Sequence, residues 1–252
     1  MLMRIDIVLV VAGLLAGAGS AHAIGVDELV AKNALARGGL DKIEAIKTLK
    51  LEGKFRVSGG YGSLEFTYVQ YNKAPDFVRI EATVQGLTQV QAWDGKQAWQ
   101  ISPFQGRRDP ERQSADDAKG LADEASISGL LINYHAKGST IEYLGQEDVD
   151  GTNAYKLKVA LKNGDIEYVY LDPDHYLEIR TIAKREVRGT ATEDITDYGD
   201  YEQIAGVYFP FSLTSQSKDG GGTTQISIDQ GHANVPLDDA LFAFPSTPTS
   251  AQ

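Results

Sequence analysis

Hydrophobic and polar residues alternate along most of the chain between Leu49 and Asn234. Side chains point to opposite faces of a strand in turn, so a period of two indicates strands with one dry and one wet face. Read in this way, the region predicts roughly ten strands separated by turns with Gly or Asp-Gly. The clearest stretch places Val78, Ile80, Ala82 and Val84 on one face and Arg79, Glu81 and Thr83 on the other. The fold class expected is α+β, mainly antiparallel β, with a single large sheet.

Two short helices are expected before the sheet. Residues 26–37 carry apolar side chains near one helical face and end at a Gly pair, Gly38 and Gly39, which is typical of a helix C-terminus. Asp41 with Glu44 three residues later has the spacing of a capping box, so a second helix is expected from Asp41 to Ile46.

One stretch, residues 114–137, interrupts the strands and predicts helix. Ser114 and Asp117 form a second candidate capping box for a helix that ends near Glu124. Residues 126–134 then repeat apolar side chains at helical spacing, at Ile127, Leu130, Leu131 and Tyr134. This stripe is either an ordinary packing face against the sheet or the inner side of a movable lid.

A large antiparallel sheet has one face to cover, and a curved sheet under short helices commonly encloses an apolar cavity on its concave side. Phe66 and Ile80 lie on apolar strand faces and are candidate cavity walls. Trp93, Trp99 and Phe104 cluster in the sequence just before the helical stretch and are candidates for the mouth of the cavity; ordinary core aromatics are the alternative.

The first 23 residues have the features of a cleaved export signal. Ile7 to Ala18 is apolar but too short to span a bilayer comfortably, and Ala21-His22-Ala23 supplies small residues at the −3 and −1 positions. We therefore expect a soluble, exported, most simply periplasmic protein. It would comprise one domain over residues 24–245, with a loose tail at residues 246–252.

Composition narrows the possible chemistry. The net charge of −11 disfavours nucleic acid and anionic membrane surfaces as partners, and no second apolar run approaches membrane-spanning length. The chain has no Cys, and His135, His175 and His232 are far apart with no metal-ligand spacing. Gly60-Tyr61-Gly62-Ser63 is not a nucleophile elbow. We expect no enzyme, no metal and no cofactor.

Several short motifs resemble a known family. They are Ala36-Arg37-Gly38-Gly39-Leu40, Gln85-Gly86-Leu87-Thr88-Gln89, Asp94-Gly95-Lys96-Gln97-Ala98-Trp99, Pro103-Phe104-Gln105-Gly106, Gly145-Gln146-Glu147-Asp148-Val149-Asp150-Gly151 and Leu171-Asp172-Pro173. Together they resemble the LolA-like superfamily of exported outer-membrane lipoprotein-sorting proteins. The resemblance implies an unclosed half-barrel of about eleven antiparallel strands with helices inside its mouth. It also implies that the concave face binds acyl chains and that an arginine holds the lid shut; Arg79, Arg107 and Arg108 are the candidates.

The leading hypothesis is a periplasmic carrier for the acyl chains of lipoproteins or another hydrophobic lipid, with a membrane-associated donor or acceptor protein as a further partner. An exposed acyl chain costs about 0.8 kcal/mol per CH₂ in water, so its transport needs a dry container. The alternative is an envelope regulatory or assembly protein that binds another protein through the same fold. An enzyme without a recognisable motif is a third possibility.

Overall fold

Thirteen strands form one antiparallel sheet in the computed structural model of this chain, which describes residues 24–60, 62–218, 220 and 222–245. The expected signal peptide, the C-terminal tail and part of the Asp219-Gly220 turn lie outside the described residues. The strands are β1 (Thr48–Gly59), β2 (Gly62–Lys73), β3 (Phe77–Val84), β4 (Leu87–Trp93), β5 (Ala98–Ser102), β6 (Arg107–Arg112), β7 (Thr140–Val149), β8 (Thr152–Ala160), β9 (Ile166–Leu171), β10 (Glu178–Val187), β11 (Thr190–Ile204), β12 (Val207–Ser217) and β13 (Thr223–Ala233).

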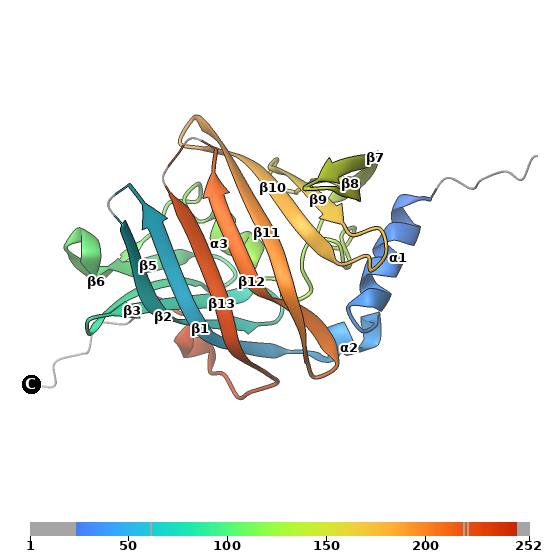
Figure 1. The fold of residues 1–252 in the computed structure, drawn as a ribbon. Coiled ribbons are helices and arrows are strands. Elements are labelled where there is room, and N and C mark those ends of the chain that lie inside the picture. The colour runs from blue at the N-terminus through green and yellow to red at the C-terminus, as the bar shows by residue number, and fades with distance from the viewer. Residues whose placement is uncertain (1–23, 61, 219, 221, 246–252) are drawn as a thin grey trace, which may run out of the picture.

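Two meanders build this sheet (Figure 1). β1 to β6 follow one another outward in one direction, β13 to β7 do so in the other, and antiparallel pairing of β1 with β13 joins the two meanders at the centre. β6 and β7 are therefore the two edges, and the sheet is not closed. The residues that lead from one edge to the other, 113–139, are here called the crossing segment.

The helices are α1 (Val26–Ala36), α2 (Leu40–Ala45) and α3 (Lys119–Glu124), with 3-10 turns η1 (Pro103–Gln105) and η2 (Asp239–Leu241). The two N-terminal helices are confirmed, but Asp41 lies inside α2, whose N-cap is Gly39 without a side-chain hydrogen bond. The predicted helix over residues 126–134 is wrong, since this stretch forms turns. Gly129 and Asn133 have left-handed φ values of 76° and 55°, which end any α-helical run.

The expected strand number was too low, and part of the difference lies at an edge. Arg107–Arg112 forms the edge strand β6, which the alternation pattern does not reveal. Pro110 and five charged side chains hide this strand from alternation-based prediction, and such residues are tolerated at an edge because its outer side makes no ladder hydrogen bonds.

One face of the sheet, here called the inner face, contacts all three helices. Leu29 of α1 packs with Leu157 in one buried cluster, Ile43 of α2 packs with Ile228 in a second, and Leu121 of α3 contributes to a third. Figure 1 shows α3 behind β11 to β13 and α1 at the β7–β9 end of the sheet. The mainly antiparallel, unclosed sheet with few helices is confirmed, but the expected helical cover differs in detail because turns replace one of its helices.

The Gly38-Gly39 pair fixes the two N-terminal helices against the sheet. A Cβ on Gly38 would lie 2.2 Å from the carbonyl oxygen of Gly206 in the β11–β12 turn, so only glycine fits there. The neighbouring carbonyl of Arg37 accepts a hydrogen bond of 2.8 Å from the backbone N–H of Tyr208. α1 and α2 are thus held close to the end of β12.

Candidate functional site

Aromatic side chains line the inner face where β1 and β2 pair. Phe55 lies opposite Phe66 in the register, with ring centroids 5.5 Å apart, and the Phe55 ring also stacks on Tyr68 at 6.4 Å. Phe104 of η1 packs edge-on against Phe66 at 5.5 Å. These four side chains are here called the aromatic strip. Alternation along β1 and β2 places the three strand residues on one face, and η1 adds Phe104 to them.

The aromatic strip ends in exposed apolar side chains. Phe104 is 42% exposed, and Leu64, two residues before Phe66 on the same face, is 46% exposed. Leu64 pairs with Val57 of β1. In the other direction the strip joins a buried cluster that includes Phe211 and Ile228. The inner face therefore has a continuous apolar path from the core to the solvent.

The crossing segment covers the rest of the inner face. Leu121 and Ala125 pack on Val78 of β3, and Leu131 packs on β8 and β9. The Asn72 side chain donates a hydrogen bond of 2.9 Å to the carbonyl of Glu124. The segment thus contacts both meanders.

Lys137 and Arg37 hold the middle of the crossing segment. The Lys137 ammonium donates to the hydroxyls of Ser126 and Ser128, at 2.9 and 2.8 Å, and to the carbonyl of Gly129 at 2.5 Å. The Arg37 guanidinium donates to the carbonyl of Ser128 at 2.7 Å. Burial, together with the nearby charge of Arg37, lowers the pKa of Lys137 to about 8 against the opposing charges of Asp76 and Glu178.

A second region of the inner face, over β9 to β11, is polar. It contains Glu167 of β9, Arg185 of β10 and Tyr198 of β11, with Glu178 at the start of β10 and Glu124 of α3. These five residues are here called the polar patch. The Tyr198 hydroxyl lies 3.1 Å from that of Thr181, and the Tyr201 hydroxyl donates to the backbone carbonyl of Glu178 at 2.8 Å.

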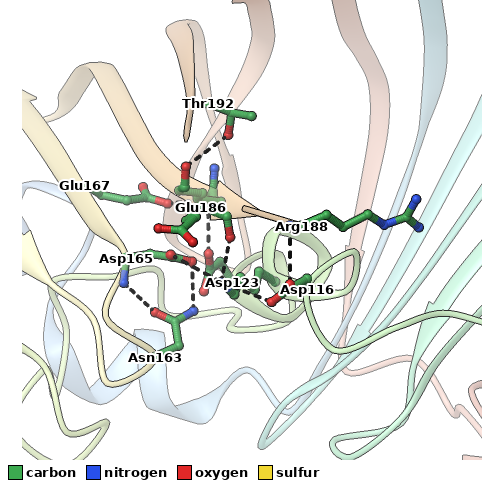
Figure 2. A network of polar contacts seen from close by, with 10 residues as sticks. Asp116, Asp123, Asn163, Asp165, Glu167, Glu186, Arg188 and Thr192 are labelled. Atoms are coloured by element: carbon green, nitrogen blue, oxygen red, sulfur yellow. Dashed lines mark hydrogen bonds and ion pairs between the residues drawn. The ribbon is translucent and has the colours of Figure 1, made fainter. Parts of the chain in front are cut away.

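Ion pairs join α3 to the neighbouring strands β9 and β10 (Figure 2). Nη2 of Arg185 donates to Asp123 of α3 at 3.0 Å and to Glu167 of β9 at 2.6 Å. Lys119, at the first turn of α3, donates to the carbonyl of Glu186 at 2.8 Å and lies 3.8 Å from Asp165. Arg188 and Asp117 form a further pair at the β10–β11 turn, where Figure 2 also shows Arg188 beside Asp116.

The carboxyl groups of the polar patch differ in exposure, since Glu167 is buried, Glu178 is half-buried and Glu124 is exposed. Burial raises the pKa of Glu167 to about 7, against the opposing charge of Arg185. Glu124 keeps solvent contact, yet its carboxyl lies among inner-face side chains, and this partial desolvation raises its pKa to about 7 as well. Burial also raises the pKa of Glu178 and, with the charges of Glu178, Glu167 and Glu124 adding to it, the pKa of Tyr198.

The structure separates the candidate mouth aromatics. Trp93 lies on the inner face against α3, whereas Trp99 is 1% exposed on the outer face, where its Nε1 donates to the carbonyl of Phe242 at 2.8 Å. The two tryptophans point to opposite faces because Trp93 pairs with Ala98, the residue directly before Trp99. Trp99 is thus a core residue of the outer face, where it holds the C-terminal segment through Phe242. Only Phe104 of the three lies beside the aromatic strip.

The other candidate residues lie on the inner face. Phe66 is buried in the aromatic strip, and Ile80 is half-buried between two clusters. The four stripe residues do not share one surface, since turns replace the expected helix. Ile127 packs on the central cluster, Leu130 and Leu131 pack on the β8–β9 cluster, and the Tyr134 hydroxyl donates to Asp27 of α1 at 3.0 Å.

None of the three candidate latch arginines contacts the crossing segment by an ion pair or a hydrogen bond among the described residues. Arg79 pairs with Glu81 on the outer face, Arg107 pairs with Glu111, and Arg108 lies on the edge strand. Arg37 and Arg185 make such contacts instead. The Ala36–Leu40 motif singled out Arg37 in the sequence, but nothing marked Arg185, which stands in an ordinary alternating strand.

Two hollows of the described structure lie away from the aromatic strip. One, of about 370 Å³, is on the outer face and is lined by polar side chains of β1, β2 and β13, including Arg56, Glu65 and Asp229. The other, of about 350 Å³, lies beside the turn that connects β10 and β11, and its lining includes Lys184, Arg185 and Lys218. Within the described part of the chain, no helix is long and apolar enough to cross a membrane.

The fold is LolA-like. A LolA superfamily protein from Nitrosomonas europaea has a similar structure, with a TM-score of 0.62 and 12% identity over 88% of this chain and 98% of that one. A DUF1329 family protein from Desulfovibrio piger gives a TM-score of 0.61 and 16% identity over 86% of this chain and 97% of that one. A Vibrio parahaemolyticus domain, provisionally described as an outer membrane lipoprotein-sorting protein domain, gives a TM-score of 0.60 and 13% identity over 86% of this chain and 95% of that one. No family model matches the sequence, and no curated protein matches it.

Proposed function

We propose that this protein binds an acyl chain or another elongated hydrophobic group on its inner face and carries it through the aqueous bacterial periplasm. One observation carries the proposal: the aromatic strip continues from the buried core to Phe104 and Leu64, which stay exposed at its end. Apolar side chains that run from a core to the surface are the surface on which a hydrophobic ligand would bury its own apolar area. The LolA-like fold is consistent with this use of the inner face.

The energetic reason for such a carrier is the cost of exposed hydrocarbon. Each CH₂ that leaves water contributes about 0.8 kcal/mol, so a chain of about ten buried methylenes would gain about 8 kcal/mol before the entropic costs of binding. The rings of Phe55, Phe66 and Phe104 offer flat apolar contact with little conformational freedom to lose.

The crossing segment would act as the cover of the binding site. It packs on both meanders through Leu121 and Leu131 and is held by the polar contacts of Arg185 and Lys137. Because α3 packs against the inner face, a ligand would reach further than the exposed end of the strip only if part of this segment moved. In this proposal, the structure corresponds to a closed form of the carrier, in which the crossing segment covers the inner face.

The first experiment is native mass spectrometry of the protein purified from its exporting cell, followed by organic extraction and identification of bound lipid. A stoichiometric lipid or acylated peptide would support the carrier function and name its cargo. Protein that is free of lipid and also fails to bind an added fluorescent fatty acid would contradict it. Crosslinking to an envelope protein under those conditions would instead favour the protein-binding alternative.

A matched pair of variants locates the site. Phe104→Ser removes an exposed ring from the aromatic strip, while Leu35→Ser removes a 75% exposed side chain from α1. The proposed function requires that only Phe104→Ser weakens binding of the fluorescent fatty acid. Equal effects of the two substitutions would show that the probe binds exposed apolar surface without regard to the inner face.

A further inference from the structure

The helix α3 contacts both meanders, and its two sides do so in different ways. Leu121 and the C-cap residue Ala125, four positions apart, pack with Val78 of β3 in a buried apolar cluster. Lys119 and Asp123, also four positions apart, instead make polar contacts with β10. One side of α3 is therefore held by apolar burial, and the other side by charged groups (Figure 2).

The charged side of α3 has more buried carboxylates than cations. Three carboxylates there have little exposed side-chain surface: 17% for Asp123, 5% for Asp165 and 7% for Glu167. In the part of the chain that the structure describes, only Arg185 and Lys119 lie within ion-pair distance of them. A buried charge without a compensating partner is costly, so the surplus carboxyl group is the natural place for a proton.

The Arg185 guanidinium serves two of these carboxylates through one nitrogen atom. Nη2 lies 3.0 Å from Asp123 and 2.6 Å from Glu167, while the buried Nε has no hydrogen-bond partner among the described residues. An arginine that pairs with one carboxylate through two parallel hydrogen bonds compensates that charge more fully. Two negative charges, one from α3 and one from β9, thus meet at a single positive charge.

The surroundings of Glu167 favour its protonated form. Burial raises the pKa of Glu167 from 4.5 to about 7 against the charge of Arg185, and the charges of Asp123, Glu178 and Glu124 act in the same direction as burial. Burial likewise raises the pKa of Asp123. The other charged or titratable groups that face this pair are Lys119 of α3, Asp165 beside β9 and the Tyr198 hydroxyl of β11.

We propose that α3 is a proton-dependent catch of the crossing segment: a proton on Glu167 or Asp123 keeps α3 docked on β9 and β10, and loss of this proton above neutral pH lets this end of the segment move. When α3 moves away, both carboxyl groups become hydrated and ionise, so docking takes up a proton and movement releases one. The preference for the docked form is fully present below the ordinary pKa of 4.5 and is lost as the pH rises through about 7.

This catch goes beyond the proposed function, because it describes how the cover is held with or without a ligand. In a carrier, it would make the inner face easier to enter at mildly alkaline pH. Only that consequence rests on the proposed function.

Hydrogen exchange of the ligand-free protein tests the catch. Wild type and Glu167→Gln are compared at the same pH, so that the intrinsic pH dependence of exchange cancels. A pKa near 7 when docked and 4.5 when released predicts that the wild-type-to-variant ratio of exchange rates in α3 rises about tenfold between about pH 6 and about pH 8.5. The same ratio in β1 should stay constant. A ratio in α3 that is constant or falls with pH overturns the proposal.

A second variant and a control complete the test. Asp123→Asn removes the surplus carboxylate from the α3 side and should give a rise in the same direction, so the result does not depend on one variant. Glu193→Gln is the matched control: its hydrogen bond with Lys218 lowers the pKa of Glu193, which stays ionised throughout, and its ratio should not change with pH. An equal rise in this control would overturn the proposal. A failed catch remains distinguishable from a failed carrier function, because these measurements involve no ligand.

Discussion

The aromatic strip and the polar patch are two regions of one inner face built in different ways. Rings of β1 and β2 meet because their strands pair in register, and Phe104 of η1 extends the strip. The patch joins three consecutive strands, β9, β10 and β11, to α3, which precedes them in the chain by the two strands β7 and β8. Contact area dominates in the first region, whereas electrostatics and hydrogen bonds dominate in the second.

This difference separates two properties of a binding protein. An apolar surface gives affinity in proportion to area and discriminates poorly between ligands of similar tail length. A polar group with unmet hydrogen bonds contributes less affinity but rejects ligands that cannot satisfy it. We therefore expect changes in the strip to alter how tightly ligands bind, and changes in the patch to alter which ligands bind and how the crossing segment is held.

The largest expected effect comes from the apolar anchor of the crossing segment. Leu131 is fully buried with Leu157 and Val159, so Leu131→Ala should destabilise the protein by about 3–5 kcal/mol through lost burial and a cavity. Urea denaturation measures this change. Leu130→Ala, at a half-buried neighbour, should cost less. Equal and small effects would show that the segment is only loosely packed and that its anchors are polar.

The polar anchor should rank second. Arg185→Gln leaves Asp123 and Glu167 without their cation, and we expect a loss of about 2–3 kcal/mol, below the value for fully buried pairs because these groups keep some solvent contact. Hydrogen exchange should increase in α3 more than in β1. Arg188→Gln, whose arginine is 72% exposed, should cost less than about 1 kcal/mol. If the two variants behave alike, the ion pairs of Arg185 do not hold α3.

A smaller effect on stability is expected from the exposed end of the strip. Phe104→Ser removes a ring that is 42% exposed, so the free energy of unfolding should fall by about 1 kcal/mol or less. Binding of a fluorescent fatty acid should fall by a larger factor than stability accounts for. A melting temperature that drops by more than about 5 °C would instead place Phe104 in the structural core.

The sequence was sufficient for the features that depend on local alternation. The mainly antiparallel sheet, the apolar strand faces that carry Phe66 and Ile80 and the two N-terminal helices all follow from residues close together in the chain. The strand Arg107–Arg112 was missed because an edge strand with Pro110 has no apolar face to reveal it. The turns at Gly129 and Asn133 were missed because the apolar spacing there is that of a helix.

The polar patch could not be predicted by the same means. Glu178, Arg185 and Tyr198 are ordinary polar residues of alternating strands, and alternation alone does not say which face is inner. Their meeting with Glu124 depends on the crossing segment, whose path from β6 to β7 is a tertiary property. The same reasoning explains Trp99, which a one-residue step along β5 places on the outer face.

The smallest expected effect, a pH dependence, belongs to the polar patch. Desolvation raises the pKa of Glu124 from 4.5 to about 7, so the fold favours the protonated carboxyl. Its contribution to stability is fully present below pH 4.5 and is lost as the pH rises through about 7. Because Gln resembles the protonated acid at every pH, Glu124→Gln should match the wild type at low pH and melt at a slightly higher temperature at about pH 8.

Glu147 provides a control of opposite sign for this prediction. Its hydrogen bond with Lys156 lowers the pKa of Glu147, so its stabilising contribution is present at neutral pH and is lost as the pH falls below the ordinary range. Thermal melting of Glu147→Gln should therefore show a deficit at about pH 8 that shrinks on acidification. A Glu124→Gln variant that gains the same stability at low and high pH would show that hydration of Glu124 resembles that of a surface carboxyl.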